Sequence, residues 1–283
     1  MDVNQAYQAC RQIIEHHSKT FAKAFNHLPK EKREGVWAVY AFCRLADDIV
    51  DEGENPEAEL KAFKDDFDTF VAGDIPEQTA LWIALDDAFK RFDFDHTPFY
   101  DMIKGQYMDL TKKRYESLDE VLTYSYHVAG TVGLMLLPIL SPDKKEELYD
   151  SAVSLGYAMQ ITNILRDVGE DLDRDRIYLP REILTKHGYT IADLENRVLD
   201  DRFIAIWEEL AEIAETHYLK GTSELNLYPL FARLPVKAAA SFYKAILNAV
   251  RRNGYQVFHE RAYVTQDEKA KIIETSINES HAR

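Results

Sequence analysis

Apolar residues recur along most of the chain at the three- and four-residue spacing of an α-helix, and short polar or proline-containing segments interrupt them. The sequence contains no convincing run of apolar–polar alternation of the kind that predicts a strand. The pattern therefore predicts a single all-α domain over residues 1–283, built as a helical bundle. The predicted helices are Asn4–His17, Phe21–Asn26, Lys30–Asp51, Glu57–Val71, Pro76–Phe92, one beginning at Thr97, Leu118–Leu137, Asp143–Asp171, Glu182–Lys186, Ile191–Asn196, Asp201–Leu219, Pro229–Arg252 and Gln266–Ser280.

The segment Leu155–Asp171 belongs to the longest predicted helix and carries polar side chains on one face of otherwise apolar material. At about 100° per residue, Asn163, Asp167 and Asp171 fall within roughly 60° of Gln160 on the helical wheel. Oxygen ligands one turn apart on one face suit a hard cation such as Mg²⁺. This face is therefore one half of a predicted cation site.

A second polar face is predicted in residues 36–51, where spacings of four, three and four residues align Tyr40, Arg44, Asp47 and Asp51. Asp48 lies about 100° from Asp47 and is a weaker candidate. Neighbouring carboxylates on a mostly apolar helix repel one another and are costly to bury without compensation. Taken alone, this face fits a solvated acidic helix end equally well. Two such faces together favour a Mg²⁺ clamp for a diphosphate, with a cavity for its apolar chain.

Several other classes of function are disfavoured. A helical di-iron site needs Glu three residues before His, and none of the 9 histidines has one. The chain has no Gly-x-Gly, so neither a dinucleotide fingerprint nor a P-loop is present. The net charge of −15, from 34 basic and 49 acidic residues, argues against a nucleic-acid binder.

The cellular setting is predicted from the two cysteines and from the apolar segments. Cys10 and Cys43 lie in apolar helical patterns without metal-ligand spacing, which is typical of buried thiols in a reducing cytoplasm. The N-terminus has no signal-peptide core, and the longest apolar run, Val132–Leu140, is too short to span a bilayer. We expect a cytoplasmic protein. A peripheral membrane contact for product release, and the oligomeric state, stay open.

Three long motifs in this order resemble those of the squalene/phytoene synthases, which are head-to-head prenyltransferases. They are Asp47-Asp48-Ile49-Val50-Asp51, Tyr124–Gly133, and Leu155–Asp171 with its continuation Arg176–Pro180. The resemblance extends from His17 to the C-terminal helices and is strongest to the short bacterial dehydrosqualene (4,4′-diapophytoene) synthases. It implies an isoprenoid-synthase helical bundle with a central substrate cavity.

The resemblance also implies roles for individual residues. It implies metal binding by Asp47, Asp51, Asn163, Asp167 and Asp171. It implies contacts with diphosphate or its surroundings by His17, Ser18, Lys19, Thr20, Arg44 and Arg166. The implied reaction-centre residues are Tyr40, Tyr124, Gln160 and Tyr243, and the implied channel residues are Phe21, Val128, Ala129, Val132 and Gly133. From the residues alone, Ser18 is also a plausible N-cap, Arg166 a partner for an acidic neighbour, and Tyr243 a core residue.

The activity implied by the resemblance is condensation of two farnesyl diphosphates through presqualene diphosphate. Loss of a proton then gives dehydrosqualene, whereas hydride from NADPH would give squalene. Two or three Mg²⁺ ions are implied, without FAD, and NADPH is not expected. We hypothesise that the departing diphosphate accepts the proton. Three alternatives remain: a phytoene synthase that uses geranylgeranyl diphosphate, a squalene synthase, and a non-catalytic assembly relative. The depth of the cavity would decide between farnesyl and geranylgeranyl diphosphate, and Phe21 or Leu134 are candidates for the residue that sets this depth.

Overall fold

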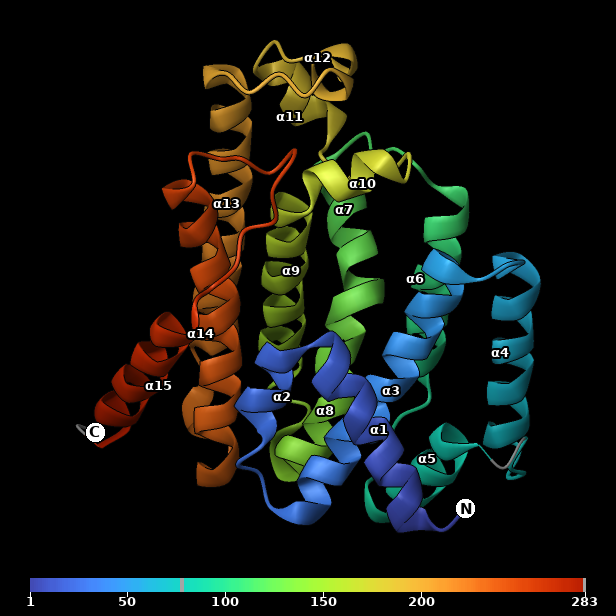
Figure 1. The fold of residues 1–283 in the computed structure, drawn as a ribbon. Helices are drawn as coiled ribbons and strands as arrows, with labels where there is room; N and C mark the ends of the chain where they lie inside the picture. The colour runs from blue at the N-terminus through green and yellow to red at the C-terminus, as the bar shows by residue number, and fades with distance from the viewer. Residues whose placement is uncertain (77–78, 282–283) are drawn as a thin grey trace.

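Long helices run side by side through most of the molecule (Figure 1), as the periodicity of the sequence predicts. The computed structural model describes residues 1–76 and 79–281. From the N-terminus, the first six helices are α1 (Val3–His17), α2 (Lys19–Phe25), α3 (Lys30–Glu52), α4 (Pro56–Val71), α5 (Ala80–Arg91) and α6 (Thr97–Thr111). Residues 77–78, in the predicted helix Pro76–Phe92, lie outside the described residues.

The chain after α6 contains the remaining α-helices and three short turns of other helix types. They are α7 (Leu118–Ser125), the π-helical turn η1 (Tyr126–Gly130), α8 (Thr131–Leu140), the 3₁₀ turn η2 (Pro142–Lys144), α9 (Tyr149–Arg166), α10 (Val168–Asp173), α11 (Arg181–Lys186), α12 (Ile191–Glu195), α13 (Asp201–Thr222), the 3₁₀ turn η3 (Leu225–Leu227), α14 (Leu230–Arg252) and α15 (Gln266–His281). Within the described ranges the only β pairing is one parallel bridge between Arg114 and Ile177. The all-α prediction is confirmed.

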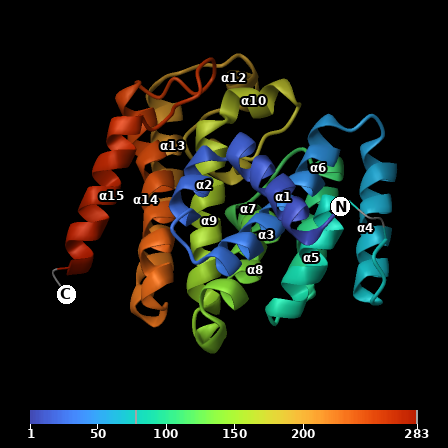
Figure 2. The same ribbon diagram turned by 60° about the horizontal axis from the view of Figure 1, so that its bottom comes forward.

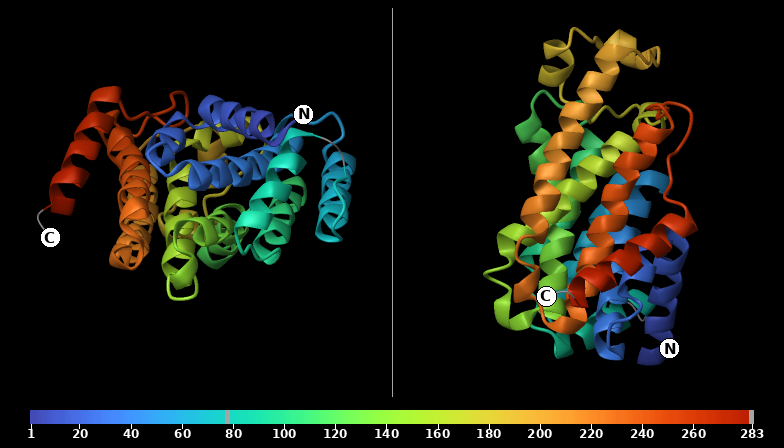
Figure 3. Two further views of the ribbon diagram at one scale, coloured as in Figure 1. Left: turned by 90° about the horizontal axis from the view of Figure 1, so that it is seen from below. Right: turned by 90° about the vertical axis from the view of Figure 1, so that its left-hand side faces the viewer.

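Two helices with polar faces, α3 and α9, each form the centre of a packed group. Helix α3 contacts α1, α4, α5 and α6, whereas α9 contacts α13, α14 and η1 (Figures 1 and 2). Helix α8 touches both α3 and α9, so the two groups meet along it. Helix α15 packs on the outside of α14 (Figure 3). The polar faces of α3 and α9 therefore come from different groups and can face one another across the junction.

The predicted helix Leu118–Leu137 is confirmed as one unbroken helical run, within which η1 forms a π-helical turn between α7 and α8. The hydroxyl of Thr131 donates to the carbonyl of His127 at 2.7 Å at the end of this turn. The expected stop at Pro138 is wrong, since α8 continues to Leu140. The π turn brings Gly130 against Gly156 of α9, where a Cβ added at Gly156 would lie 2.5 Å from the Gly130 nitrogen. Such turns occur often at functional sites.

The predicted helix Asp143–Asp171 is wrong at both ends, because α9 starts at Tyr149 and stops at Arg166. Tertiary hydrogen bonds explain the stop. The Gly169 N–H donates to the carbonyl of Val257 at 3.0 Å, and the Trp207 indole N–H donates to the carbonyl of Leu165 at 3.0 Å. Gly169 fits because a Cβ there would meet the Phe258 carbonyl oxygen at 2.2 Å. Asp171 is therefore carried by the separate short helix α10.

Two expectations about the cellular setting can be compared with the fold. Cys10 is buried as predicted, whereas Cys43 is only partly buried because it borders the central cavity. In the described part of the chain no helix is long and apolar enough to cross a membrane.

Candidate active site

Two adjoining cavities lie between α3 and α9, one polar and one apolar. Five residues line both: Tyr40, Cys43, Val128, Gln160 and Asn163. The polar cavity adds Arg44, Asp47, Met102, Gln106 and Tyr124. The apolar cavity encloses about 930 Å³, counting space open to solvent, and its wall includes Phe21, Ala129, Val132, Gly133 and Tyr243. The structure thus places all of the predicted reaction-centre and channel residues around these two adjoining cavities.

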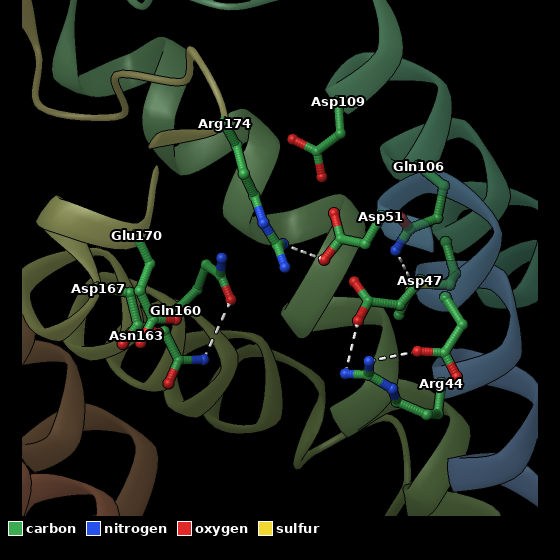
Figure 4. Close-up of polar contacts among 12 residues, drawn as sticks. Arg44, Asp47, Asp51, Gln106, Asp109, Gln160, Asn163, Asp167, Glu170 and Arg174 are labelled. Carbon is green, nitrogen blue, oxygen red and sulfur yellow. Dashed lines mark hydrogen bonds and ion pairs between the residues drawn. The ribbon is translucent and has the colours of Figure 1, made fainter. Parts of the chain in front are cut away.

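The α3 side of the site presents carboxylates that are paired with arginines (Figure 4). Arg44 forms ion pairs with Asp47, at 2.9 Å, and with Asp48. Asp51, one turn beyond Asp47, accepts hydrogen bonds from Arg176, at 2.7 Å, and from Arg174. Because α3 is continuous from Lys30 to Glu52, the predicted alignment of Asp47 with Asp51 is confirmed.

The opposite side of the site comes from α9 and α10. The Asn163 amide donates to the Gln160 side-chain oxygen at 3.5 Å, as expected for neighbours one turn apart. Asp167 is paired with Arg166 at 2.7 Å and with Arg261 at 3.2 Å. Although the helix breaks at Asp167, the Asp171 N–H still donates to the Asp167 carbonyl at 2.9 Å. The two aspartates therefore remain one turn apart.

The carboxylates on both sides lie in an environment that disfavours their charge. Partial desolvation of a side chain that stays 40% exposed, and then the neighbouring Asp51 carboxylate, raise the pKa of Asp47 to about 7. Burial, and then Asp167, raise the pKa of Asp171 to about 8. Bound cations would relieve both effects, and carboxylate and amide oxygens suit Mg²⁺. Across the described residues, no three His, Cys, Asp or Glu side chains are grouped closely enough to hold a metal by themselves. The donor set fits Mg²⁺ that takes further ligands from water or a substrate.

Asp109 of α6 is a buried polar residue of the site that the sequence analysis missed. It accepts hydrogen bonds from the hydroxyls of Tyr124, at 2.8 Å, and Tyr178, at 2.6 Å. Burial raises the pKa of its carboxyl despite these bonds. In the sequence, the signal that could have identified Asp109 was an aspartate inside an otherwise apolar helix. This cluster fixes the position of Tyr124, which lines the polar cavity.

The predicted diphosphate-side residues His17–Thr20 and the predicted channel residue Phe21 lie at the break between α1 and α2. The Ser18 hydroxyl accepts from the Phe21 N–H at 3.3 Å, so its N-cap role is confirmed. The Thr20 hydroxyl accepts from Lys269 of α15 at 2.9 Å. His17 is exposed, and partial desolvation and then the Arg44 charge lower the pKa of its ring. Phe21 lines the apolar cavity, and Lys19 is exposed at the break.

The structure also locates Arg166 and Leu134. Arg166 pairs with its acidic neighbour Asp167, and its role toward diphosphate stays a prediction. Leu134 is buried in the core and is not among the residues that line the apolar cavity, whereas Phe21, Leu136 and Leu140 line it.

Comparison with known proteins identifies the family. The model of the squalene/phytoene synthase family matches residues 14–268. The chain belongs to this family. Squalene/phytoene synthases are prenyltransferase-type enzymes, so the chain is a transferase of isoprenoid biosynthesis.

Three relatives show how the family varies. The chain is 38% identical to the 15-cis-phytoene synthase of Synechococcus elongatus, covering 93% of this chain and 89% of that one. It is 35% identical to the farnesyl diphosphate phosphatase YisP of Bacillus subtilis, covering 96% and 98%. A crystal structure of a dehydrosqualene synthase in complex with ligand superposes with a TM-score of 0.94 at 36% identity, covering 99% and 98%.

Proposed function

We propose that the chain catalyses the Mg²⁺-dependent head-to-head condensation of two farnesyl diphosphates, through presqualene diphosphate, to dehydrosqualene. The observation that carries this proposal is the polar cavity, lined by Asp47 of α3 and by Gln160 and Asn163 of α9, which opens into an apolar cavity through five shared residues. Asp47, Asp51, Asn163, Asp167 and Asp171 would hold the metal ions. Bound Mg²⁺ would neutralise the diphosphate and improve it as a leaving group.

The chain's own residues would orient the two substrates and protect the reacting carbons. Tyr40, Gln160 and Asn163 stand where the polar cavity meets the apolar one, which is where an allylic C1 would lie. The apolar wall would exclude water from the allylic cation formed when the first diphosphate leaves. The double bond of the second substrate would then attack this cation, and loss of a proton would close the cyclopropane ring of presqualene diphosphate. A second ionisation, rearrangement and proton loss would complete the sequence.

The departing diphosphate is our candidate for the proton acceptor. Burial raises the pKa of the Cys43 thiol to about 12 and raises the pKa of Tyr40 above its usual value. Both side chains therefore stay protonated beside the reacting carbons and are poor bases. Diphosphate held at the polar end is a stronger acceptor and is already present.

The apolar cavity is long enough for a farnesyl chain. Its wall follows α9 from Asn163 to Ala152, which corresponds to about 16 Å at about 1.5 Å per residue. A farnesyl main chain of about twelve carbons, with bonds of about 1.5 Å, extends roughly 14 Å. A geranylgeranyl main chain of about sixteen carbons extends roughly 19 Å. Along α9 the wall is therefore long enough for an extended farnesyl chain.

Shortening a wall residue at the far end should therefore shift the substrate preference. Leu140→Ala is expected to raise the use of geranylgeranyl over farnesyl diphosphate by about tenfold or more, because it deepens the cavity. The matched control is Leu137→Ala, which removes a buried leucine of the same helix that does not line the cavity. Competition assays with both diphosphates would measure the ratio. An equal shift in this ratio in both variants would contradict the placement of Leu140 at the far end of the cavity.

Incubation with each diphosphate, with and without NADPH, and identification of the products would test the proposed function. Farnesyl diphosphate and Mg²⁺ alone should give dehydrosqualene and inorganic diphosphate, and EDTA should stop the reaction. Formation of phytoene from geranylgeranyl diphosphate would instead identify a phytoene synthase. Formation of squalene that requires NADPH would identify a squalene synthase. Farnesol and phosphate would indicate a phosphatase, which is the activity named for the Bacillus subtilis relative. No release of diphosphate would favour the non-catalytic alternative.

A further inference from the structure

The turn between α10 and α11 places two arginines on one carboxylate of the site. Arg174 and Arg176 flank Asp175, which has a positive φ of 57°. Arg114 anchors this turn, since its guanidinium donates to the Asp175 carbonyl oxygen and to the Asp175 carboxylate, both at 2.7 Å. Arg114 thus holds the middle residue of the turn, and the side chains of Arg174 and Arg176, which precede and follow that residue, both reach Asp51.

The two arginines differ in how firmly they are held. The Arg176 side chain is 11% exposed, and Asp51 accepts from it at 2.7 Å deep in the site. The Arg174 side chain is 48% exposed and reaches Asp51 from the solvent side. A long side chain that is half exposed can change its rotamer at small cost, and an exposed ion pair contributes little stability. Of the two, Arg174 is therefore the one free to exchange its partner.

The guanidinium of Arg174 lies in the space between the two sides of the site. Figure 4 shows it next to Asp51 of α3, with Gln160 and Asn163 of α9 across from it. Its charge partly compensates the Asp51 carboxylate, which is the task that divalent cations would perform more strongly.

We propose that Arg174 is a diphosphate-binding residue that exchanges partners: it pairs with Asp51 in the free enzyme and with the substrate diphosphate once Mg²⁺ is bound. This inference rests on the proposed function. Mg²⁺ and Arg174 compete for the same carboxylate, so metal binding releases the guanidinium. The released guanidinium faces a diphosphate whose oxygens accept paired hydrogen bonds from arginine. Arg176, which is nearly buried, stays on Asp51 and keeps that carboxylate oriented.

The test is Arg174→Gln, followed by isothermal titration calorimetry with MgCl₂ alone and then with sodium diphosphate in saturating MgCl₂. Loss of the competing cation should tighten Mg²⁺ binding about two- to fivefold, the size expected for an exposed ion pair. Loss of a charged donor should weaken diphosphate binding about tenfold or more. Arg174→Lys keeps the charge without the paired donors, so it should leave Mg²⁺ binding unchanged and give an intermediate loss of diphosphate affinity.

Arg181→Gln is the matched control, because Arg181 follows the same turn and pairs with Glu116 at 3.5 Å on the surface. It should change neither affinity. Unchanged diphosphate binding in Arg174→Gln would overturn the proposal, and so would weaker Mg²⁺ binding, since Arg174 would then support Asp51 instead of competing for it. If the unmodified enzyme bound neither Mg²⁺ nor diphosphate, the proposed function itself would fall.

Discussion

Replacing Asp47 by asparagine is expected to lower turnover by a factor of about 10²–10³ or more while leaving the fold intact. Asparagine keeps the size of the side chain but removes a negative charge from the polar cavity. That charge is needed if Asp47 and Asp51 together bind the cation that neutralises the diphosphate. Steady-state assays of diphosphate release from farnesyl diphosphate at saturating Mg²⁺ would measure the loss.

The same substitution should not lower stability, which separates loss of function from loss of fold. Partial desolvation and Asp51 raise the pKa of Asp47 to about 7, so at pH 8 the folded state carries a charge that its surroundings disfavour. Removing this charge should leave the melting temperature at pH 8 equal or higher. Arg44 keeps its ion pair with Asp48.

Asp65→Asn is the control for the Asp47 prediction. Asp65 lies on the outer helix α4 and pairs with Lys61 at 2.6 Å, with its side chain 56% exposed. This variant should keep full activity. Full activity in Asp47→Asn as well would count heavily against a metal clamp between α3 and α9.

Gly156→Ala is expected to destabilise the protein strongly, by about 1–3 kcal/mol or more, because the contact between α9 and η1 has no room for a methyl group. A Cβ at Gly156 would lie 2.5 Å from the nitrogen of Gly130, 2.6 Å from its Cα and 2.7 Å from the carbonyl carbon of Ala129. These are backbone atoms, so relief requires that the two helices move apart. Denaturant unfolding would measure the loss of stability.

Gly130→Ala is a close control because Gly130 faces Gly156 across the same contact. There the nearest atoms to a new Cβ belong to the Tyr126 side chain, at 3.2 Å, and to Val153, at 3.5 Å. Side chains can adjust where backbone cannot, and alanine also favours the helical conformation. This variant should therefore lose much less stability. Equal losses would show that helix packing at the contact is not the reason for glycine at position 156.

The positions of helices and the polar face of α3 could be predicted because both follow from local geometry. Apolar spacing reports which side of a helix is buried, and it places Tyr40, Arg44, Asp47 and Asp51 together as long as the helix is unbroken. The same reasoning applied to Leu155–Asp171 aligned Gln160 with Asn163 but assumed a continuous helix through Asp167. The structure interrupts that helix, and a single remaining hydrogen bond preserves the turn between Asp167 and Asp171.

The residues that the sequence did not reveal are those whose partners lie far away in the chain. Asp109 joins the site through Tyr124 and Tyr178, which lie 15 and 69 residues later. Arg174 meets Asp51 across 123 residues. Periodicity cannot detect such pairs, because it records only which side chains share a face of one element.

By itself, the sequence determined the all-α fold, the two acidic faces and the resemblance to the squalene/phytoene synthases, since helical periodicity and motif order are local properties of the chain. Only the tertiary structure decided where α9 ends, which arginines compensate each aspartate and how far the apolar cavity extends. These depend on contacts between α3, α9 and the segments packed against them. The end of α9 is the clearest case, because the Gly169 N–H bonds to Val257, whose position only the folded chain determines.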